Sequence, residues 1–367
     1  MIEIPENITE LKSYKPGKPI QEIIADLGLD KTAVLWNNEN NFGPSPMALE
    51  EVSKVLGNSH VYPDPVSLEL RKRIAELNQR QVDEVVVGNG SEEIFNNLFN
   101  AFFKPGEELL TCTGTFVAVY IWAKANKVPV HTVPLTSDYR FDPDALYQAI
   151  TPKTKAIYLA NPNNPTGAII EEDELRSFLD KIPSHIIVVV DEAYFEFARD
   201  ISPKYPDTSG WDYDNLITLR TFSKAYGIAA IRIGYALAKP ALIEALAKVK
   251  LTFAPSNLAQ AAGNGAIQDE AFLAKTIDNN TQEMEKFCAS LDEMGFRHVP
   301  SYGNFVMLEM DSADQVQAYF HELLKKGVFV RPLPAFGLPH CLRITIGLPE
   351  ENQLCVDALK ECKVQLS

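Results

Sequence analysis

Apolar and polar positions follow two periods along most of the chain from residue 85 onward. Short runs rich in β-branched residues are separated by stretches in which apolar residues recur at helical spacing. Strands that alternate with helices need crossover connections, which favour a mostly parallel sheet buried on both faces. The pattern predicts strands at residues 85–87, 108–112, 128–133, 156–160, 186–190, 216–219 and 231–236, and helices at 91–103, 115–126, 142–150 and 171–181.

The rhythm changes after about residue 265. A long polar helical stretch reaches Met294, and short strand-like and helical segments follow it, which is typical of a second, smaller α+β unit. Strands are expected at 304–309, 328–331 and 342–346, and helices near 313–325 and 350–362. The first forty residues are rich in Pro, Asn and Gly and indicate an arm or linker. The predicted organisation is an arm at 1–40, a large α/β domain at 41–265 and a small C-terminal domain at 266–367.

Composition and charge narrow the class of protein. The 367 residues are 46% hydrophobic and 23% charged, as in a globular enzyme, and 49 acidic against 34 basic residues give a net charge of -15. That charge opposes extended contact with nucleic acid or anionic lipid. No signal peptide is recognisable, and the apolar runs are far shorter than the roughly 20 residues of a membrane helix. We therefore expect a cytoplasmic enzyme with no nucleic-acid or membrane partner.

Cysteine and histidine spacing predicts neither disulfides nor a metal site. The five cysteines are scattered, odd in number and contain no C-x-x-C pair, and the six histidines lack the spacing of metal ligands. A reducing compartment is the simplest interpretation.

The residues that follow the predicted strands carry the candidate chemistry, because ligands of an open parallel sheet bind beyond the carboxyl ends of its strands. The turn at 88–91, GNGS, opens a helix whose free N–H groups suit a phosphate, although an ordinary strand-to-helix turn has the same pattern. The segment 161–167, NPNNPTG, holds an amide rigidly between prolines. Asp191 ends a strongly apolar strand, where a buried carboxylate needs a cationic partner such as a protonated ring nitrogen.

Lys224 lies among hydroxyl side chains after the strand at 216–219, with Arg232 expected to open the next strand. Burial and a nearby positive charge lower the pKa of a lysine and favour an amine that attacks carbonyl groups. One lysine carries little weight alone. Together, the phosphate-type turn, the aimed amide, the carboxylate and the lysine at one sheet edge match what pyridoxal phosphate requires.

Longer motifs extend this interpretation to a family. The strings NPNNPTG, DEAYFEF, TFSKAYGIAAIRIGY and LRITIGLPEEN, in this order and spacing, resemble the class I/II, fold-type-I aminotransferases. With LKSYKPGKP, NNENNFGPSP and VYPDP, the chain is most similar to the histidinol-phosphate aminotransferase family from residue 14 to 351. The resemblance implies a large pyridoxal-phosphate-binding α/β domain with a mostly parallel seven-stranded sheet covered by helices on both faces. It also implies a smaller α+β domain, and a homodimer with shared active sites that moves an amino group between a small amino donor and a 2-oxo acid.

The resemblance implies a role for each matching residue. Lys224 would be the Schiff-base lysine and general base, Asp191 would hold the pyridine nitrogen protonated, and Asn164 and Tyr194 would face the phenolic oxygen. The other implied cofactor contacts are Gly90, Ser91, Thr221, Ser223 and Arg232 at the phosphate, Tyr62 reaching the phosphate from the neighbouring subunit, and Phe116 stacked on the ring.

Substrate contacts are implied in the same way. Arg343 would clamp an α-carboxylate or the corresponding end of histidinol phosphate, with Asn164 close to it. Arg331, twelve residues earlier, and Tyr14 in the arm are candidates for a distal phosphate. A surface arginine and an interface tyrosine are the competing interpretations of these two residues.

Three departures from the family pattern leave the substrate open. Asn41 stands where proline usually follows NEN, Gly114 replaces a proline before the stacking aromatic, and Val119 replaces a tyrosine, with Tyr120 one residue later. Transamination of histidinol phosphate with 2-oxoglutarate, a step of histidine biosynthesis, is the first expectation. An aromatic amino acid aminotransferase is the alternative, followed by a decarboxylase or lyase. A transcription regulator would need an N-terminal basic helix-turn-helix, which the first forty residues do not encode.

Overall fold

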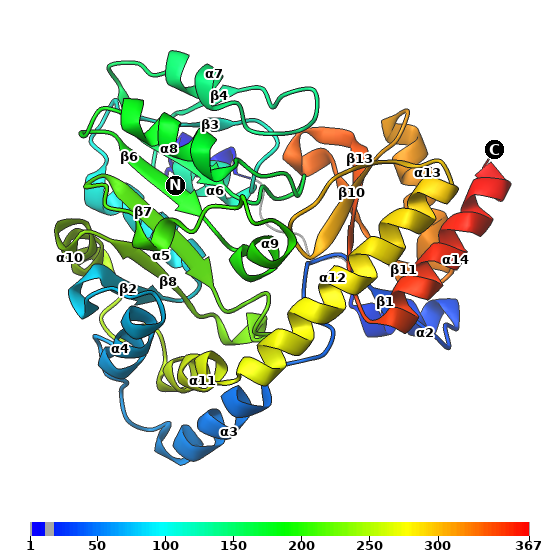
Figure 1. Cartoon of the computed structure of the whole chain (residues 1–367), viewed down its shortest axis with the longest axis horizontal. Helices are drawn as coiled ribbons and strands as arrows, with labels where there is room; N and C mark the ends of the chain where they lie inside the picture. Colours follow the sequence, from blue (N-terminus) through cyan, green and yellow to red (C-terminus); the bar gives the residue numbers. More distant parts are fainter. Residues whose placement is uncertain (1, 12–17, 367) are drawn as a thin grey trace.

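The computed structural model describes residues 2–11 and 18–366 and contains two principal sheets (Figure 1). The larger sheet has seven strands in the order β2-β8-β7-β6-β5-β3-β4. All neighbouring strands are parallel except where β8 pairs antiparallel with β2 and β7. The predicted mostly parallel seven-stranded sheet is therefore confirmed. Its strands are β2 (Val85–Gly88), β3 (Glu108–Cys112), β4 (Val130–Val133), β5 (Thr154–Ala160), β6 (Ile187–Asp191), β7 (Leu216–Thr221) and β8 (Gly234–Ala238).

Helices bury both faces of this sheet, as predicted. The side chains of β6 alternate, because Ile187 and Val189 pack into one core while Val188 and Val190 pack into the opposite one. The first face is covered by α5 (Ser91–Phe102), α6 (Ala118–Ala125) and α10 (Pro240–Val249). The second is covered by α7 (Pro143–Gln148) and α8 (Glu172–Lys181), and near β2 and β8 by α3 (Pro46–Val55), α4 (Leu68–Leu77) and α11 (Asn257–Gln268).

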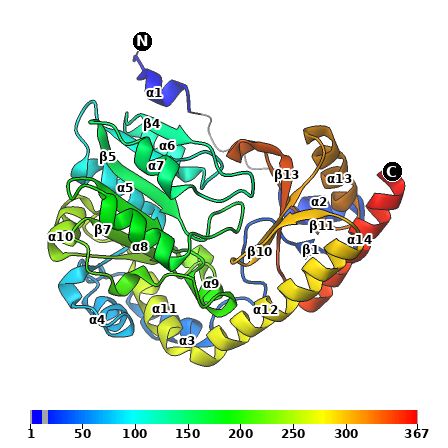
Figure 2. The ribbon, with the colours of Figure 1, turned by 45° about the horizontal axis from the view of Figure 1, so that its top comes forward.

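The long helix α12 (Glu270–Glu293) leads from the large domain to a smaller α+β unit, which follows it in the chain (Figures 1 and 2). Its antiparallel sheet has the order β12-β13-β10-β9. The strands are β9 (Arg297–Val299), β10 (Phe305–Glu309), β12 (Arg331–Leu333) and β13 (Leu338–Thr345), and the helices are α13 (Ala313–Lys325) and α14 (Pro349–Leu366). The structure divides the expected strand at 328–331, because β11 (Val328–Phe329) pairs with β1 (Ala33–Val34) and only β12 joins the sheet.

The first forty residues contain α1 (Glu6–Thr9), α2 (Ile20–Leu27) and β1. Ala33 and Leu35 are fully buried in the core of the smaller unit, so the end of this segment packs against residues near 328. The domain limits at 40/41 and 265/266 stay a prediction. Across residues 2–11 and 18–366, no helix combines the length and hydrophobicity that crossing a lipid bilayer requires.

The start of β8 differs from the prediction because the backbone at Arg232 is left-handed, a conformation outside the β region. The strand begins at Gly234 rather than residue 231, and Arg232 follows a short 3-10 helix, Ala229–Ile231, in a left-handed conformation with φ of 60°. Gly234 packs so tightly that an added Cβ would lie 2.4 Å from the Ser91 backbone nitrogen. Arg232 therefore precedes the strand, still at the edge where the parallel strands end.

A buried ion pair joins the ends of β6 and β7. Arg220 donates from Nε and Nη2 to Glu192 Oε2 at 2.9 and 2.7 Å, and both side chains are almost fully buried. The same guanidinium donates to Asn78 and Asp207, and it lies 3.3 Å from the centre of the Phe195 ring. Removing one partner of such a pair leaves an unpaired buried charge.

We expect Arg220→Met to destabilise the fold by about 3–5 kcal/mol, because Glu192 would stay buried without a cation. Urea denaturation followed by circular dichroism measures this change in the free energy of unfolding, from the first unfolding transition. Arg297→Met is the matched control, since Arg297 pairs with Asp311 at the surface, where their side chains are 62% and 82% exposed. Equal midpoints for the two variants would contradict a structural role for the buried pair.

Candidate active site

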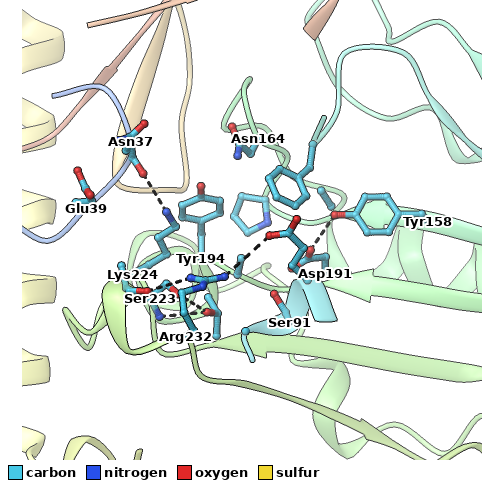
Figure 3. A pocket seen from close by; sticks show the side chains of 18 residues that line it. Asn37, Glu39, Ser91, Tyr158, Asn164, Asp191, Tyr194, Ser223, Lys224 and Arg232 are labelled. Atoms are coloured by element: carbon cyan, nitrogen blue, oxygen red, sulfur yellow. Dashed lines mark hydrogen bonds and ion pairs between the residues drawn. The ribbon is translucent and has the colours of Figure 1, made fainter. Parts of the chain in front are cut away.

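A cavity of about 260 Å³ lies at the carboxyl ends of the parallel strands (Figure 3). Sequence motifs scattered over more than 140 positions contribute its walls, as expected for the edge of an open parallel sheet. The predicted site residues that line it are Gly90, Ser91, Phe116, Asn164, Asp191, Tyr194, Thr221, Ser223, Lys224 and Arg232.

Lys224 follows β7 and points toward the N-terminal segment across the cavity (Figure 3). Its Nζ donates a hydrogen bond to the Asn37 carbonyl oxygen at 3.0 Å. Burial, assisted by the positive charges of Arg343 and Arg232 and opposed by Glu39, lowers the pKa of the Lys224 amine to about 8. The amine thus loses its proton far more readily than an exposed lysine, as a nucleophile or base requires.

Asp191 is the last residue of β6, and its side chain is buried. Its Oδ2 accepts a hydrogen bond from the Tyr158 hydroxyl at 2.8 Å, whereas Oδ1 has no hydrogen-bond partner among the described residues. Burial raises the pKa of the Asp191 carboxyl to about 6, and the Tyr158 hydrogen bond opposes that rise. A buried acceptor without a donor is costly, so Oδ1 is suited to a ligand N–H in the cavity.

Tyr194 is buried close to Lys224, whose Nζ lies 6.0 Å from the tyrosine ring centre. The Tyr194 hydroxyl accepts a hydrogen bond from Asn38 Nδ2 at 2.8 Å, which leaves its own proton for another acceptor. Burial raises the pKa of this hydroxyl, so it remains a neutral donor. Asn164 accepts a hydrogen bond from Arg343 Nη1, and this contact joins the cavity wall to the smaller unit.

Five predicted phosphate contacts line the cavity, and Figure 3 shows three of them, Ser91, Ser223 and Arg232, along one side of it. Ser91 begins α5, whose unpaired N–H groups and dipole favour an anion. Thr221 donates from its hydroxyl to Ser223 Oγ at 3.0 Å. Gly90 has a φ of 77°, and an added Cβ there would lie 2.7 Å from Arg232 Nη2. Glycine at position 90 therefore lets the guanidinium approach the start of the helix.

Arg343 and Arg331 lie directly opposite each other on the antiparallel strands β13 and β12. Side chains at opposed positions share one face of a sheet, with Cβ atoms about 5 Å apart. Arg343 is buried and donates from Nη2 to the Trp36 carbonyl at 2.7 Å. Burial and the positive charge of Arg331 lower the pKa of Arg343 to about 10. The Nε atoms of both arginines are buried without hydrogen-bond partners among the described residues. Two adjacent guanidiniums with spare donors are suited to anions.

Among the described residues, the predicted site residues that do not line this cavity are Tyr62, Arg331 and Arg343, of which Arg343 contacts its wall through Asn164. Tyr62 is 75% exposed and stacks on Phe253, with ring centres 4.2 Å apart. Tyr14 lies outside the described residues.

The N-terminal segment at 36–40 contains residues to which the sequence analysis assigned no role, although the motif NNENNFGPSP begins at residue 37. The Trp36 and Asn37 carbonyls accept hydrogen bonds from Arg343 and Lys224, and Asn38 binds Tyr194. Tyr158 was also missed. Alternation within the predicted strand at 156–160 could have placed it on one face of the sheet, but not next to Asp191.

The three departures from the family pattern all lie outside the cavity lining. Asn41 donates from Nδ2 to Glu351 at 2.6 Å, and Gly114 has a φ of 72°, which proline cannot adopt. Val119 is fully buried in the core, while the Tyr120 hydroxyl donates to the Cys112 carbonyl at 2.7 Å. None of these residues supplies a polar group to the cavity.

Comparison with known proteins gives a consistent result over nearly the whole chain. The model of the family "Aminotransferase class I and II" matches residues 31–359. The histidinol-phosphate aminotransferase of Anaeromyxobacter sp. (strain Fw109-5) is 39% identical over 358 residues, covering 97% of this chain and 98% of that protein. Histidinol-phosphate aminotransferase 2 of Hydrogenovibrio crunogenus is 40% identical over 364 residues, covering 98% and 96%.

Solved structures agree in fold. The histidinol-phosphate aminotransferase of Sinorhizobium meliloti, in complex with pyridoxal-5'-phosphate, has a TM-score of 0.90 and 26% identity, covering 100% of this chain and 99% of that one. A Thermus thermophilus aspartate aminotransferase has a TM-score of 0.86 at 23% identity, covering 99% of this chain and 100% of that one, and shares the fold.

The lowered pKa of Lys224 predicts that its reductive methylation by formaldehyde and borane reaches half its maximal rate near pH 8. Arg343→Leu should move this midpoint upward, because the guanidinium disfavours the charged ammonium. Peptide mass spectrometry between pH 6.5 and 9.5 resolves the modified lysine. Arg297→Leu, at the surface of the smaller unit, serves as control, and a midpoint that shifts equally in both variants would refute the electrostatic explanation.

Proposed function

The chain belongs to the class I and II aminotransferase family, and from this premise we propose that it moves an amino group from histidinol phosphate to 2-oxoglutarate with pyridoxal 5'-phosphate as cofactor. The single observation that carries the choice of substrate is the opposed pair Arg331 and Arg343, two guanidiniums on one face of the small sheet. Arg343 is hydrogen-bonded to Asn164 in the cavity wall, so the pair adjoins the cavity that holds Lys224.

The cavity residues fit the proposed cofactor. A ring nitrogen that carries a proton would satisfy the free oxygen of Asp191, and a phosphate would satisfy the N–H groups at Ser91 and the guanidinium of Arg232. When bound, pyridoxal phosphate supplies an aldehyde that captures amines and a ring that accepts the electron pair released at the substrate α-carbon. Phe116 lines the same cavity and supplies an aromatic surface for the ring.

We assign the covalent attachment and the proton transfers to Lys224 Nζ. The low pKa of this amine leaves a usable neutral fraction near pH 8, and its position beside Tyr194 keeps it in the reaction space. Asp191 would hold an ionised oxygen toward the ring nitrogen of the bound cofactor. Tyr194 and Asn164 would donate to the oxygen substituent of the ring, and the hydrogen bond from Asn38 keeps the Tyr194 hydroxyl oriented.

Arg343 and Arg331 are proposed to hold the two ends of the substrate. Arg343, next to Asn164, binds the end nearer Lys224, and Arg331 binds the distal phosphate. Guanidinium groups form paired, charge-assisted hydrogen bonds with phosphate oxygens. Tyr14 remains a proposed further contact to this phosphate.

An aromatic amino acid aminotransferase is the second candidate. The observation that favours it is Val119, which is fully buried in the core at the position where the family pattern has a tyrosine, so one hydroxyl of that pattern is absent. A site with one polar group fewer suits a plain aromatic side chain.

We also propose where the protein works and how it assembles. All five cysteines are free, and four of them are buried, which suits the reducing cytoplasm. Exposed apolar side chains lie close in sequence to Tyr62 and to Phe253, which stacks on it, and exposed apolar side chains of this kind suit association with a second copy. They are Leu56, Val61, Val66, Leu251 and Phe253, which are 46% to 68% exposed. We propose a homodimer in which Tyr62 reaches the cofactor phosphate of its partner.

Comparing two amino donors tests the substrate. Arg331→Ala should lower kcat/KM for histidinol phosphate by about tenfold or more, because one charge-assisted hydrogen bond contributes roughly 1.5–3 kcal/mol. The same variant should change kcat/KM for phenylalanine little. Should wild type prefer phenylalanine, and Arg331→Ala affect both donors equally, the aromatic alternative replaces histidinol phosphate.

Hybrid dimers test the shared site. Lys224→Ala and Tyr62→Ala proteins are each expected to be nearly inactive, and mixing them should restore up to about a quarter of wild-type activity, since half of the randomly mixed dimers hold one intact site. Native mass spectrometry verifies subunit exchange. Verified exchange without recovered activity would mean that each site is built from one chain.

A further inference from the structure

Tyr158 and Asp191 meet because of the register between β5 and β6. The strands pair in parallel with Ala160 opposite Asp191 and Tyr158 opposite Val189. Tyr158, Ala160 and Val189 contribute to the core on one face of the sheet, and Asp191 follows the same alternation along β6. Tyr158 is thus a diagonal neighbour of Asp191, within reach of a tyrosine side chain.

The hydrogen bond between them has only one possible direction. An ionised carboxylate accepts and cannot donate, so the Tyr158 hydroxyl is the donor to Asp191 Oδ2 over 2.8 Å. Burial and the carboxylate charge raise the pKa of Tyr158 well above its usual value, so the phenol keeps its proton. The tyrosine is fully buried, and its ring packs edge-to-face on Phe95 with centres 5.1 Å apart. The donor is therefore fixed by packing.

The two carboxylate oxygens of Asp191 differ in their hydrogen bonding. Oδ2 is engaged by Tyr158, while Oδ1 is buried with no partner among the described residues, and both residues line the cavity. Figure 3 shows Tyr158 beside Asp191, on the side away from Lys224. A carboxylate held at one oxygen keeps its orientation and presents the other oxygen to a ligand.

We propose that Tyr158 is a positioning residue that keeps Asp191 ionised and turned toward the ring nitrogen of the bound cofactor. The inference rests on the proposed function, since it assumes that pyridoxal phosphate occupies the cavity. It goes beyond that function, because Tyr158 would act through Asp191 and make no contact with the reacting atoms.

The electrostatic surroundings of Asp191 make the hydroxyl important. Burial raises the pKa of the Asp191 carboxyl to about 6, the neighbouring charge of Glu192 adds to the rise, and the Tyr158 hydroxyl and the Ala193 N–H oppose it. The other titratable and charged groups that share the cavity are Glu39, Glu92, Tyr194, Lys224 and Arg232. Removing the hydroxyl should raise the pKa further, so the carboxyl would take up a proton at a higher pH.

Cofactor binding to apoenzyme between pH 5.5 and 8.5 is the decisive measurement, made by equilibrium dialysis of pyridoxal phosphate. Tyr158→Phe removes one oxygen and keeps the packing. At pH 8.5 the carboxyl is ionised in both proteins, and we expect similar Kd values. At pH 5.5 we expect Tyr158→Phe to bind roughly five- to tenfold more weakly, as an upward pKa shift of about one unit requires. Other ionisations cancel in the ratio of the two Kd values.

Two controls separate positioning from general stabilisation. Tyr205→Phe removes another buried hydroxyl, which donates to the Asn161 carbonyl, and any effect it has on Kd should be the same at both pH values. In an Asp191→Asn background no carboxyl titrates at this position, so adding Tyr158→Phe should leave the pH dependence unchanged. Melting temperatures of all variants report any loss of stability independently of binding.

The outcomes distinguish the inference from the proposed function. A Kd ratio for Tyr158→Phe that does not change with pH, or a pH-dependent ratio that persists in the Asp191→Asn background, overturns the role of Tyr158. Wild-type protein that binds no pyridoxal phosphate at any pH overturns the proposed function instead. A ratio that rises as the pH falls, only when Asp191 is present, supports the inference.

Discussion

The buried pair of Glu192 and Arg220 is the constraint on which the functional edge of the sheet depends. Glu192 directly follows Asp191, and Arg220 directly precedes Thr221, so one ion pair fixes the ends of β6 and β7 relative to each other. Two buried charges tolerate little displacement, because separating them exposes each to a medium of low dielectric. The ion pair lies outside the cavity lining, yet it sets the distance between the cavity residues on these two strands.

Strand alternation divides the work between the two faces of the sheet. At the end of β6, Asp191 turns toward the cavity while Glu192 turns toward Arg220. At the end of β7, Thr221 lines the cavity while Arg220 points the other way. Consecutive residues thus serve binding and stability in turn. A shift of either strand by one residue would turn its binding residue away from the cavity and its ion-pair residue into it. The register of β6 and β7 is therefore essential to the site.

The parts of the site that sequence reasoning could predict are those set by local pattern. Asp191 and Lys224 were identifiable because each follows a buried apolar run, and such runs mark strand ends without knowledge of their neighbours. Arg331 and Arg343 were expected on adjacent strands from a spacing of twelve residues, and the strands place them face to face. The loop that aims Asn164 was visible from its prolines.

The remaining parts depend on contacts that no local pattern encodes. Tyr158 meets Asp191 only through the register of β5 on β6, and Asn38 meets Tyr194 only because a segment 156 positions away crosses the cavity. The predicted start of β8 was wrong because Arg232 adopts a left-handed conformation, which the residue type arginine does not predict.

The pairing of β1 with β11 has a consequence for how the protein reaches its active form during synthesis. Ala33 emerges from the ribosome early, yet its strand partner Val328 is made almost three hundred residues later, and Arg343 binds Trp36 across 307 positions. All seven strands of the large sheet lie between residues 85 and 238, so this sheet can form before residue 328 is made. The N-terminal strand β1 therefore has no partner until residues 328 and 329, in roughly the last tenth of the chain, have been synthesised. Closure of the cavity is therefore a late event, and a chain truncated near residue 325 could fold its large sheet and still lack a finished site.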